Sequence, residues 1–135
     1  MAIRAQTLRH LRFWLTLSFW ACCALAFAMA LGPGSGLPWL DSGAGTLRHV
    51  MAFSVLTFFA FLAFRERTGF TIFILLAAIG GAIEILQLIP GLHREADIKD
   101  WLVDTLTSGT ILLVLHRFTA KTHNYALAEQ DSARP

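Results

Sequence analysis

Four long apolar runs occupy most of this 135-residue chain, and each is long enough to cross a lipid bilayer. They cover about residues 13–32, 47–64, 69–88 and 98–115. The segments between the runs are short and hold many of the charged residues. Apolar runs of about 17–25 residues are typical of membrane spans. The pattern therefore predicts an all-α integral membrane bundle of four transmembrane helices.

The composition agrees with a membrane protein and excludes other classes. Hydrophobic residues make up 56% of the chain, and only 15% of its residues are charged. A net charge of +2 on such a chain does not indicate a nucleic-acid partner, so we expect the lipid bilayer as its surroundings and no nucleic acid. Cys22 and Cys23 lie inside the first run, where we interpret them as small hydrophobic residues. Nothing in the pattern defines an oligomeric state.

The chain divides into three segments. We predict a basic cytoplasmic N-terminus (1–12), a transmembrane domain (13–117) and a polar cytoplasmic tail (118–135). The first run also has the small-residue pattern of a signal-peptide cleavage site around 26–30. Because this run is longer than a usual signal core, we interpret it as a retained helix, with a cleaved signal peptide as the alternative.

The positive residues predict the orientation of the bundle. With both termini in the cytoplasm, eight of the eleven Lys and Arg residues lie inside and three outside. The inner residues are Arg4, Arg9, Arg12, Arg65, Arg67, Arg117, Lys121 and Arg134. The outer residues are Arg48, Arg94 and Lys99. Cytoplasmic segments carry the excess of positive charge, so this orientation, in a bacterial cytoplasmic (inner) membrane, is the one we predict.

The ionisable residues of the spans gather at the outer side. Glu84 lies in the third run, where a carboxylate at mid-depth costs about 2.5–3.5 kcal/mol on an insertion scale. His49 begins the second helix, Gln87 shares a helix face with Glu84, and Asp100 and Asp104 begin the fourth helix. The orientation above brings all of them to one outward-facing cluster.

Spacing within the last two helices supports close packing. Four residues follow the spacing of one helix face and form a polar stripe that we expect to face the bundle: Asp97, Asp100, Asp104 and Ser108. Small residues four apart let two membrane helices approach closely. Such pairs are Ala77 with Gly81 and Thr105 with Gly109.

The cluster allows three kinds of chemistry. Glu84 and His49 are candidate acid–base partners. Glu84, Asp100 and Asp104 are candidate ligands of a divalent cation, although the sequence defines no cofactor. The candidate substrate-binding residues are Gln87, Arg94, Asp97, Asp100 and Asp104, and Arg94 suits a phosphate or a carboxylate. In the structural alternative, Glu84 pairs with Arg94 or Gln87 and only holds helices together. No nucleophile motif makes the chain an enzyme on sequence alone.

The order of these residues resembles the signature of VanZ-like proteins. Glu84-x-x-Gln87, an Arg in the next loop (Arg94) and an Asp opening the next helix (Asp100) follow that order, and His49 matches a histidine that begins an earlier helix. The resemblance covers about 48–115. The departures are Gly45-Thr46 where the family often has Asp-Lys, Asp104 where Asn is common, and Thr107-Ser108 where a Gly is usual.

The resemblance implies a small multi-helix protein of the bacterial inner membrane, in a family named for a determinant of teicoplanin-type glycopeptide resistance. It implies no particular reaction. We predict a VanZ-like accessory protein of the cell envelope with an outward-facing polar site, acting on a lipid-linked or glycan-related substrate or in glycopeptide resistance. The alternatives are a membrane enzyme that uses Glu84 and His49, with or without a divalent cation, and a purely structural membrane partner.

Overall fold

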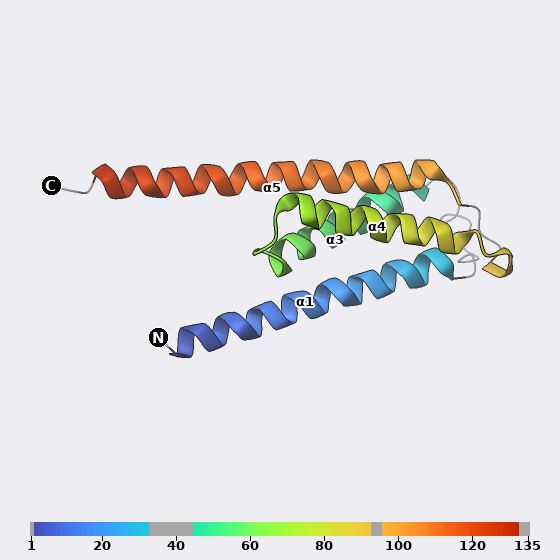
Figure 1. The fold of residues 1–135 in the computed structure, drawn as a ribbon, viewed down its shortest axis with the longest axis horizontal. Helices are drawn as coiled ribbons and strands as arrows, with labels where there is room; N and C mark the ends of the chain where they lie inside the picture. Colours follow the sequence, from blue (N-terminus) through green and yellow to red (C-terminus); the bar gives the residue numbers. More distant parts are fainter. Residues whose placement is uncertain (1, 33–44, 93–95, 133–135) are drawn as a thin grey trace.

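The computed structural model of the chain describes residues 2–32, 45–92 and 96–132. These residues form four α-helices and one short 3-10 helix and contain no strand, which confirms the all-α prediction. The helices, shown in Figure 1, are α1 (Ala2–Leu31), α3 (Gly45–Ala63), α4 (Gly69–Gln87), η1 (Pro90–Leu92) and α5 (Ile98–Ser132).

The helices α3 and α4 occupy the middle of the bundle. Both α1 and α5 pack along α3 and α4, and Figure 1 shows α1 on one side of this pair and α5 on the other. The two termini and the α3–α4 turn lie at one end of the bundle (Figure 1). The other end, which we call the polar end, is formed by the C-termini of α1 and α4 and the N-termini of α3 and α5.

Three of the four predicted spans are confirmed by length and apolarity. These are Gln6–Leu31 within α1, and the whole of α3 and α4. Among the described residues α5 is not a clear span, although its length suffices. The reason is its polar content: Lys99, Asp100 and Asp104 fall in its first two turns, and Ser and Thr residues follow them.

The predicted starts of α4 and α5 agree with the structure, but the outer limits of α1 and α5 do not. At Thr68, the hydroxyl Oγ1 accepts a hydrogen bond from Thr71 N at 3.2 Å and caps α4. The helix α1 begins at Ala2, well before residue 13, and α5 continues past residue 115 to Ser132. Both extensions are free of Gly and Pro, so the backbone continues as a helix beyond the apolar run.

The core is apolar and the outer faces are apolar as well. The buried cluster consists of Phe19, Cys23, Phe53, Leu56, Ala60, Ile72, Leu76, Ile79, Ile83 and Leu112. Large side chains such as Phe70, Ile85 and Leu106 are about two-thirds exposed, as expected for surfaces that face lipid. Cys22 and Cys23 are free thiols, in agreement with their interpretation as small hydrophobic residues.

Small residues bring α4 and α5 into close contact, as predicted. Trp101 of α5 lies over Gly81, and its Nε1 donates a hydrogen bond to Ala77 O of α4 at 3.0 Å. At Gly109, an added Cβ would stand 3.3 Å from Cε2 of Phe73. Side chains larger than these would separate the two helices at the depth where the polar residues lie.

Candidate functional site

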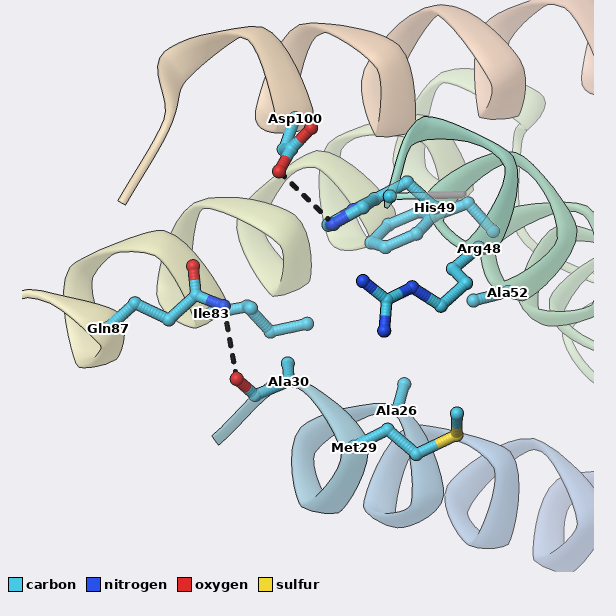
Figure 2. A pocket seen from close by; sticks show the side chains of 11 residues that line it. Ala26, Met29, Ala30, Arg48, His49, Ala52, Ile83, Gln87 and Asp100 are labelled. Atoms are coloured by element: carbon cyan, nitrogen blue, oxygen red, sulfur yellow. Dashed lines mark hydrogen bonds and ion pairs between the residues drawn. The ribbon is translucent and has the colours of Figure 1, made fainter. Parts of the chain in front are cut away.

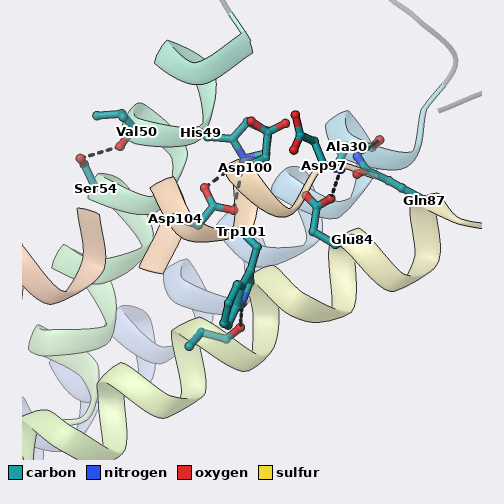
Figure 3. Close-up of polar contacts among 11 residues, drawn as sticks. Ala30, His49, Val50, Ser54, Glu84, Gln87, Asp97, Asp100, Trp101 and Asp104 are labelled. Carbon is teal, nitrogen blue, oxygen red and sulfur yellow. Dashed lines mark hydrogen bonds and ion pairs between the residues drawn. The ribbon is translucent and has the colours of Figure 1, made fainter. Parts of the chain in front are cut away.

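His49 lies between two carboxylates of α5 at the polar end. Its Nδ1 stands 3.0 Å from Oδ1 and 3.2 Å from Oδ2 of Asp104, and its Nε2 stands 3.3 Å from Oδ2 of Asp100 (Figure 3). Asp104 is fully buried, whereas Asp100 is one-third exposed. An ionised carboxylate only accepts hydrogen bonds, so when Asp104 is ionised this contact requires the tautomer of His49 with a proton on Nδ1.

Gly80 makes room for the buried carboxylate. Asp100 and Asp104 are four residues apart and share a helix face, which turns both toward α3. A Cβ at Gly80 of α4 would stand 3.4 Å from Oδ2 of Asp104 and 3.3 Å from Cζ of Phe53. Sequence reasoning missed Gly80; the signal that identifies it is a Gly-Gly pair inside an apolar helix, where close backbone approach is the usual cause.

Below Asp104 the polar stripe continues into the bundle and then ends. Ser108 and Thr57 are fully buried, with their hydroxyls 3.1 Å apart, and Thr57 Oγ1 also donates to Phe53 O at 2.5 Å. The prediction that the stripe faces the bundle is confirmed for Asp104 and Ser108, whereas Asp97 is exposed. The next turns are packed by apolar residues of the core.

Glu84 is buried but does not pair with His49 among the described contacts. Its Oε2 accepts a hydrogen bond from Asp97 N at 2.8 Å, and its Oε1 is buried without a hydrogen-bond partner in the described part of the chain. Asp97 in turn accepts from Lys99 N at 2.9 Å through Oδ1 and so caps α5. Glu84 therefore fastens the start of α5 to α4.

The remaining predicted site residues have separate positions. Gln87 Nε2 donates to Ala30 O at 3.1 Å and ties α4 to the end of α1 (Figure 3). Arg94 lies outside the described residues, so its predicted pairing with a substrate or with Glu84 stays a prediction. Among the described residues, no three His, Cys, Asp or Glu side chains are grouped to hold a metal ion.

A partly open cavity of about 210 Å³ lies beside His49 and is lined by residues of all four α-helices (Figure 2). Its polar lining consists of Arg48, His49, Gln87 and Asp100. Its other lining residues are Ala26, Met29, Ala30, Gly45, Ala52, Phe53 and Ile83. Glu84, Asp97 and Asp104 do not line it.

Arg48 is a cavity residue that the sequence reasoning counted only as an outer positive charge. Figure 2 shows its guanidinium projecting among the lining residues of α1 and α4. The available signal was its place directly before His49, in the first turn of a predicted span. A cation at that depth belongs to the same outer zone as the predicted polar cluster.

Comparison with known proteins gives one family. A family model described as VanZ/LLP1 matches residues 6–119. No curated protein and no solved structure matches the chain. The matched range includes every cavity residue and every predicted site residue.

Proposed function

The chain belongs to the VanZ-like (VanZ/LLP1) family, whose members are membrane proteins, and on that premise we propose that it is an accessory protein of the bacterial inner membrane that binds a lipid-linked envelope substrate in an outward-facing cavity. The cavity at the polar end is the observation that carries this proposal. It combines charged and apolar lining in one space, which fits an amphiphile with an anionic head group.

The polar lining suits a phosphate or a carboxylate. A guanidinium presents five N–H donors in a planar fork, more than one neighbouring group occupies, so Arg48 can bind an anion while it keeps another contact. His49 and Gln87 supply further polar atoms beside it. The side chains of Ala26, Met29 and Ala52 give the same space an apolar wall for the first carbons of a lipid chain.

The placement of charge supports a cavity that opens to the outside. The end of the bundle that holds the start of α1, the α3–α4 turn and the end of α5 also holds the described inner positive residues, and the polar end lies opposite. We propose α5 as the fourth span because its outward side chains are apolar: Leu102, Leu106 and Leu113 are each about half to two-thirds exposed. Its polar side chains Asp104 and Ser108 are turned inward.

The test is native mass spectrometry of the full chain in detergent with farnesyl phosphate as the probe. Farnesyl phosphate is expected to bind, whereas farnesol and inorganic phosphate each bind at least about tenfold more weakly, because each supplies only half of the contacts. Arg48→Gln is expected to weaken farnesyl phosphate about tenfold or more, since it removes a charged partner from a partly desolvated site. The matched control is Arg67→Gln, an exposed cation at the opposite end.

Equal binding of farnesol and farnesyl phosphate would exclude an anion site. No binding of either would favour the structural alternative, in which the buried polar groups only hold helices together. Glycopeptide resistance is a narrower prediction that rests on the family name alone. It is checked by comparing teicoplanin susceptibility of a host strain with and without the gene.

A further inference from the structure

The geometry points to a hydrolytic activity in the same cavity: we propose that His49 is a general base, positioned by Asp104, for hydrolysis of a lipid-linked diphosphate. This inference rests on the proposed function, because the cavity must first bind the anionic head group. It goes further in assigning a reaction, a substrate class and separate roles to two residues.

The contacts of His49 separate its two nitrogens by role. Nδ1 faces the fully buried Asp104, whose ionised carboxylate can accept a proton-bearing Nδ1 and hold the ring in place. Nε2 is the nitrogen beside the cavity, where it lies 3.3 Å from Oδ2 of the partly exposed Asp100, and His49 and Asp100 both line that cavity. An imidazole whose one nitrogen is held by a buried carboxylate, and whose other nitrogen lies at the edge of the binding space, resembles the base arrangement of many hydrolases.

Water is the nucleophile in this proposal. The described residues that line the cavity include no Ser, Thr or Cys, so no hydroxyl or thiol side chain is placed there to form a covalent intermediate. A single base is sufficient when the leaving group is already acidic. A phosphoanhydride meets this condition, because its leaving group is itself a phosphate, whereas an alcohol needs a separate acid.

The step balances without a further reactant. His49 Nε2 takes a proton from water while the water oxygen bonds to the terminal phosphorus. The bond between that phosphorus and the bridging oxygen breaks, and the lipid monophosphate and inorganic phosphate leave. The proton on Nε2, stabilised by Asp100 at 3.3 Å, returns to a product phosphate and restores the base. Arg48 holds the phosphate oxygens as their charge shifts.

Charged groups surround His49 on three of the four helices. Asp100 and Asp104 of α5 and Glu84 of α4 act on it electrostatically, and Arg48 precedes it on α3. The α1 residues of the cavity, Ala26, Met29 and Ala30, are uncharged. The rate is therefore expected to depend on pH through His49 within this set of groups.

The experiment measures phosphate release from farnesyl diphosphate by the full chain in lipid nanodiscs. The wild type is expected to release phosphate. His49→Gln is expected to lower kcat about 100-fold or more, the usual contribution of a general base. Asp104→Asn is expected to lower kcat by a similar factor with little change in KM, because the Asn amide N–H can donate to Nδ1 and so favour the tautomer with the proton on Nε2, which cannot act as the base. Arg67→Gln is the control and keeps the wild-type rate.

A change in the pH profile separates positioning from folding. In the wild type, the rate of phosphate release is expected to fall at low pH, because Nε2 then carries a proton and cannot act as a base. In Asp104→Asn, the low residual rate is expected to show no such fall at low pH. Farnesyl diphosphate that binds to the wild type but is not hydrolysed overturns the activity and leaves the binding function standing. Wild-type rates in His49→Gln overturn it as well. If neither binding nor release occurs, both proposals fail.

Discussion

Glu84 illustrates how a buried carboxylate in a membrane helix can have a structural role, by hydrogen bonding to the segment before the next helix. One of its oxygens accepts Asp97 N at 2.8 Å, and the other is buried without a partner in the described part of the chain. It does not line the cavity, unlike Gln87 one turn later. Glu84 thereby holds the segment before α5 against α4. In our proposals His49 alone acts as the base, and Glu84 does not have the acid–base role predicted for it.

Replacing Glu84 separates a fastening role from a catalytic one. Glu84→Gln keeps an oxygen that can accept Asp97 N, so we expect a change in unfolding free energy below about 1 kcal/mol and an unchanged rate of phosphate release. Glu84→Ala removes the acceptor and is expected to cost about 1–3 kcal/mol. Denaturant titration of the protein in detergent measures both. A large loss of activity in a well-folded Glu84→Gln variant would return Glu84 to the catalytic set.

Gly80 is a second residue whose replacement gives a clear outcome. A methyl group there would stand 3.3 Å from Phe53 Cζ and 3.4 Å from Asp104 Oδ2, closer than most contacts of a Cβ. Gly80→Ala is therefore expected to destabilise the bundle by about 1–3 kcal/mol through overpacking. Gly69→Ala is the matched control, because nothing lies within 4 Å of a Cβ at that position. Equal stability of the two variants in denaturant titration would contradict the packing described.

The residues of the cluster were predictable, but their pairing was not. Spacing along the chain places His49, Glu84 and Asp104 at the same end of the bundle, because helix geometry fixes their depth. It does not fix the rotation of α3 about its axis. In the structure, Phe53 packs close to Gly80, and His49, one turn before it on α3, contacts Asp104 and not Glu84.

At the scale of the helices, one ion pair joins α1 to the α3–α4 turn. Arg12 Nη1 lies 2.8 Å from Glu66 Oε1, and both side chains are largely exposed. The hydrogen bond and the charge of Arg12 lower the pKa of Glu66 below its ordinary value of 4.5. A lowered pKa in the folded state means that the pair stabilises the fold above pH 4.5 and that this stabilisation disappears as the pH falls through the folded pKa.

Glu66→Gln tests this contact. The wild type is expected to be slightly more stable than the variant at pH 7, and the difference is expected to vanish in acid and to shrink in high salt, because exposed ion pairs are screened. Denaturant titration across pH 3–7 in detergent gives the comparison (about four pH points suffice). A difference that grows as the pH falls would have the wrong sign for this pair.

The starts of α4 and α5 were predictable, but the outer limits of α1 and α5 were not. Thr68 before Gly69 is a local cap signal, and the polar link before α5 interrupts the apolar run. The outer limits were set from the apolar runs, which report bilayer thickness. Backbone helicity instead continues until a breaker appears, so Ala2 and Ser132 lie well outside the apolar runs.

For the whole molecule, the start of α1 and the end of α5 lie at the same end of the bundle, an arrangement that agrees with the proposed four crossings of a membrane (Figure 1). The positive residues predict which end faces the cytoplasm. Single cysteines at opposite ends test this prediction. Arg67 and Lys99 are both exposed. Arg67 precedes α4 in the chain and Lys99 follows it, so the two residues lie at opposite ends of that helix.

Labelling in intact cells with a membrane-impermeant maleimide gives the orientation. In a chain whose Cys22 and Cys23 are replaced by Ala, Lys99→Cys is expected to react from outside. Arg67→Cys is expected to react only after the membrane is permeabilised. The reverse pattern would invert the bundle and turn the cavity toward the cytoplasm. Reaction of both from one side would mean that α4 does not cross the bilayer.

The unbroken course of α5 gives the molecule a mechanical property. From Asp100 at the cavity to Ser132 the helix advances by 32 residue positions, a length of about 48 Å. For a straight rod of this length, a tilt of about 5° about the cavity end corresponds to a displacement of about 4 Å at the far end. The length of α5 thus amplifies any change of its tilt at the polar end into a larger displacement at the end near Ser132.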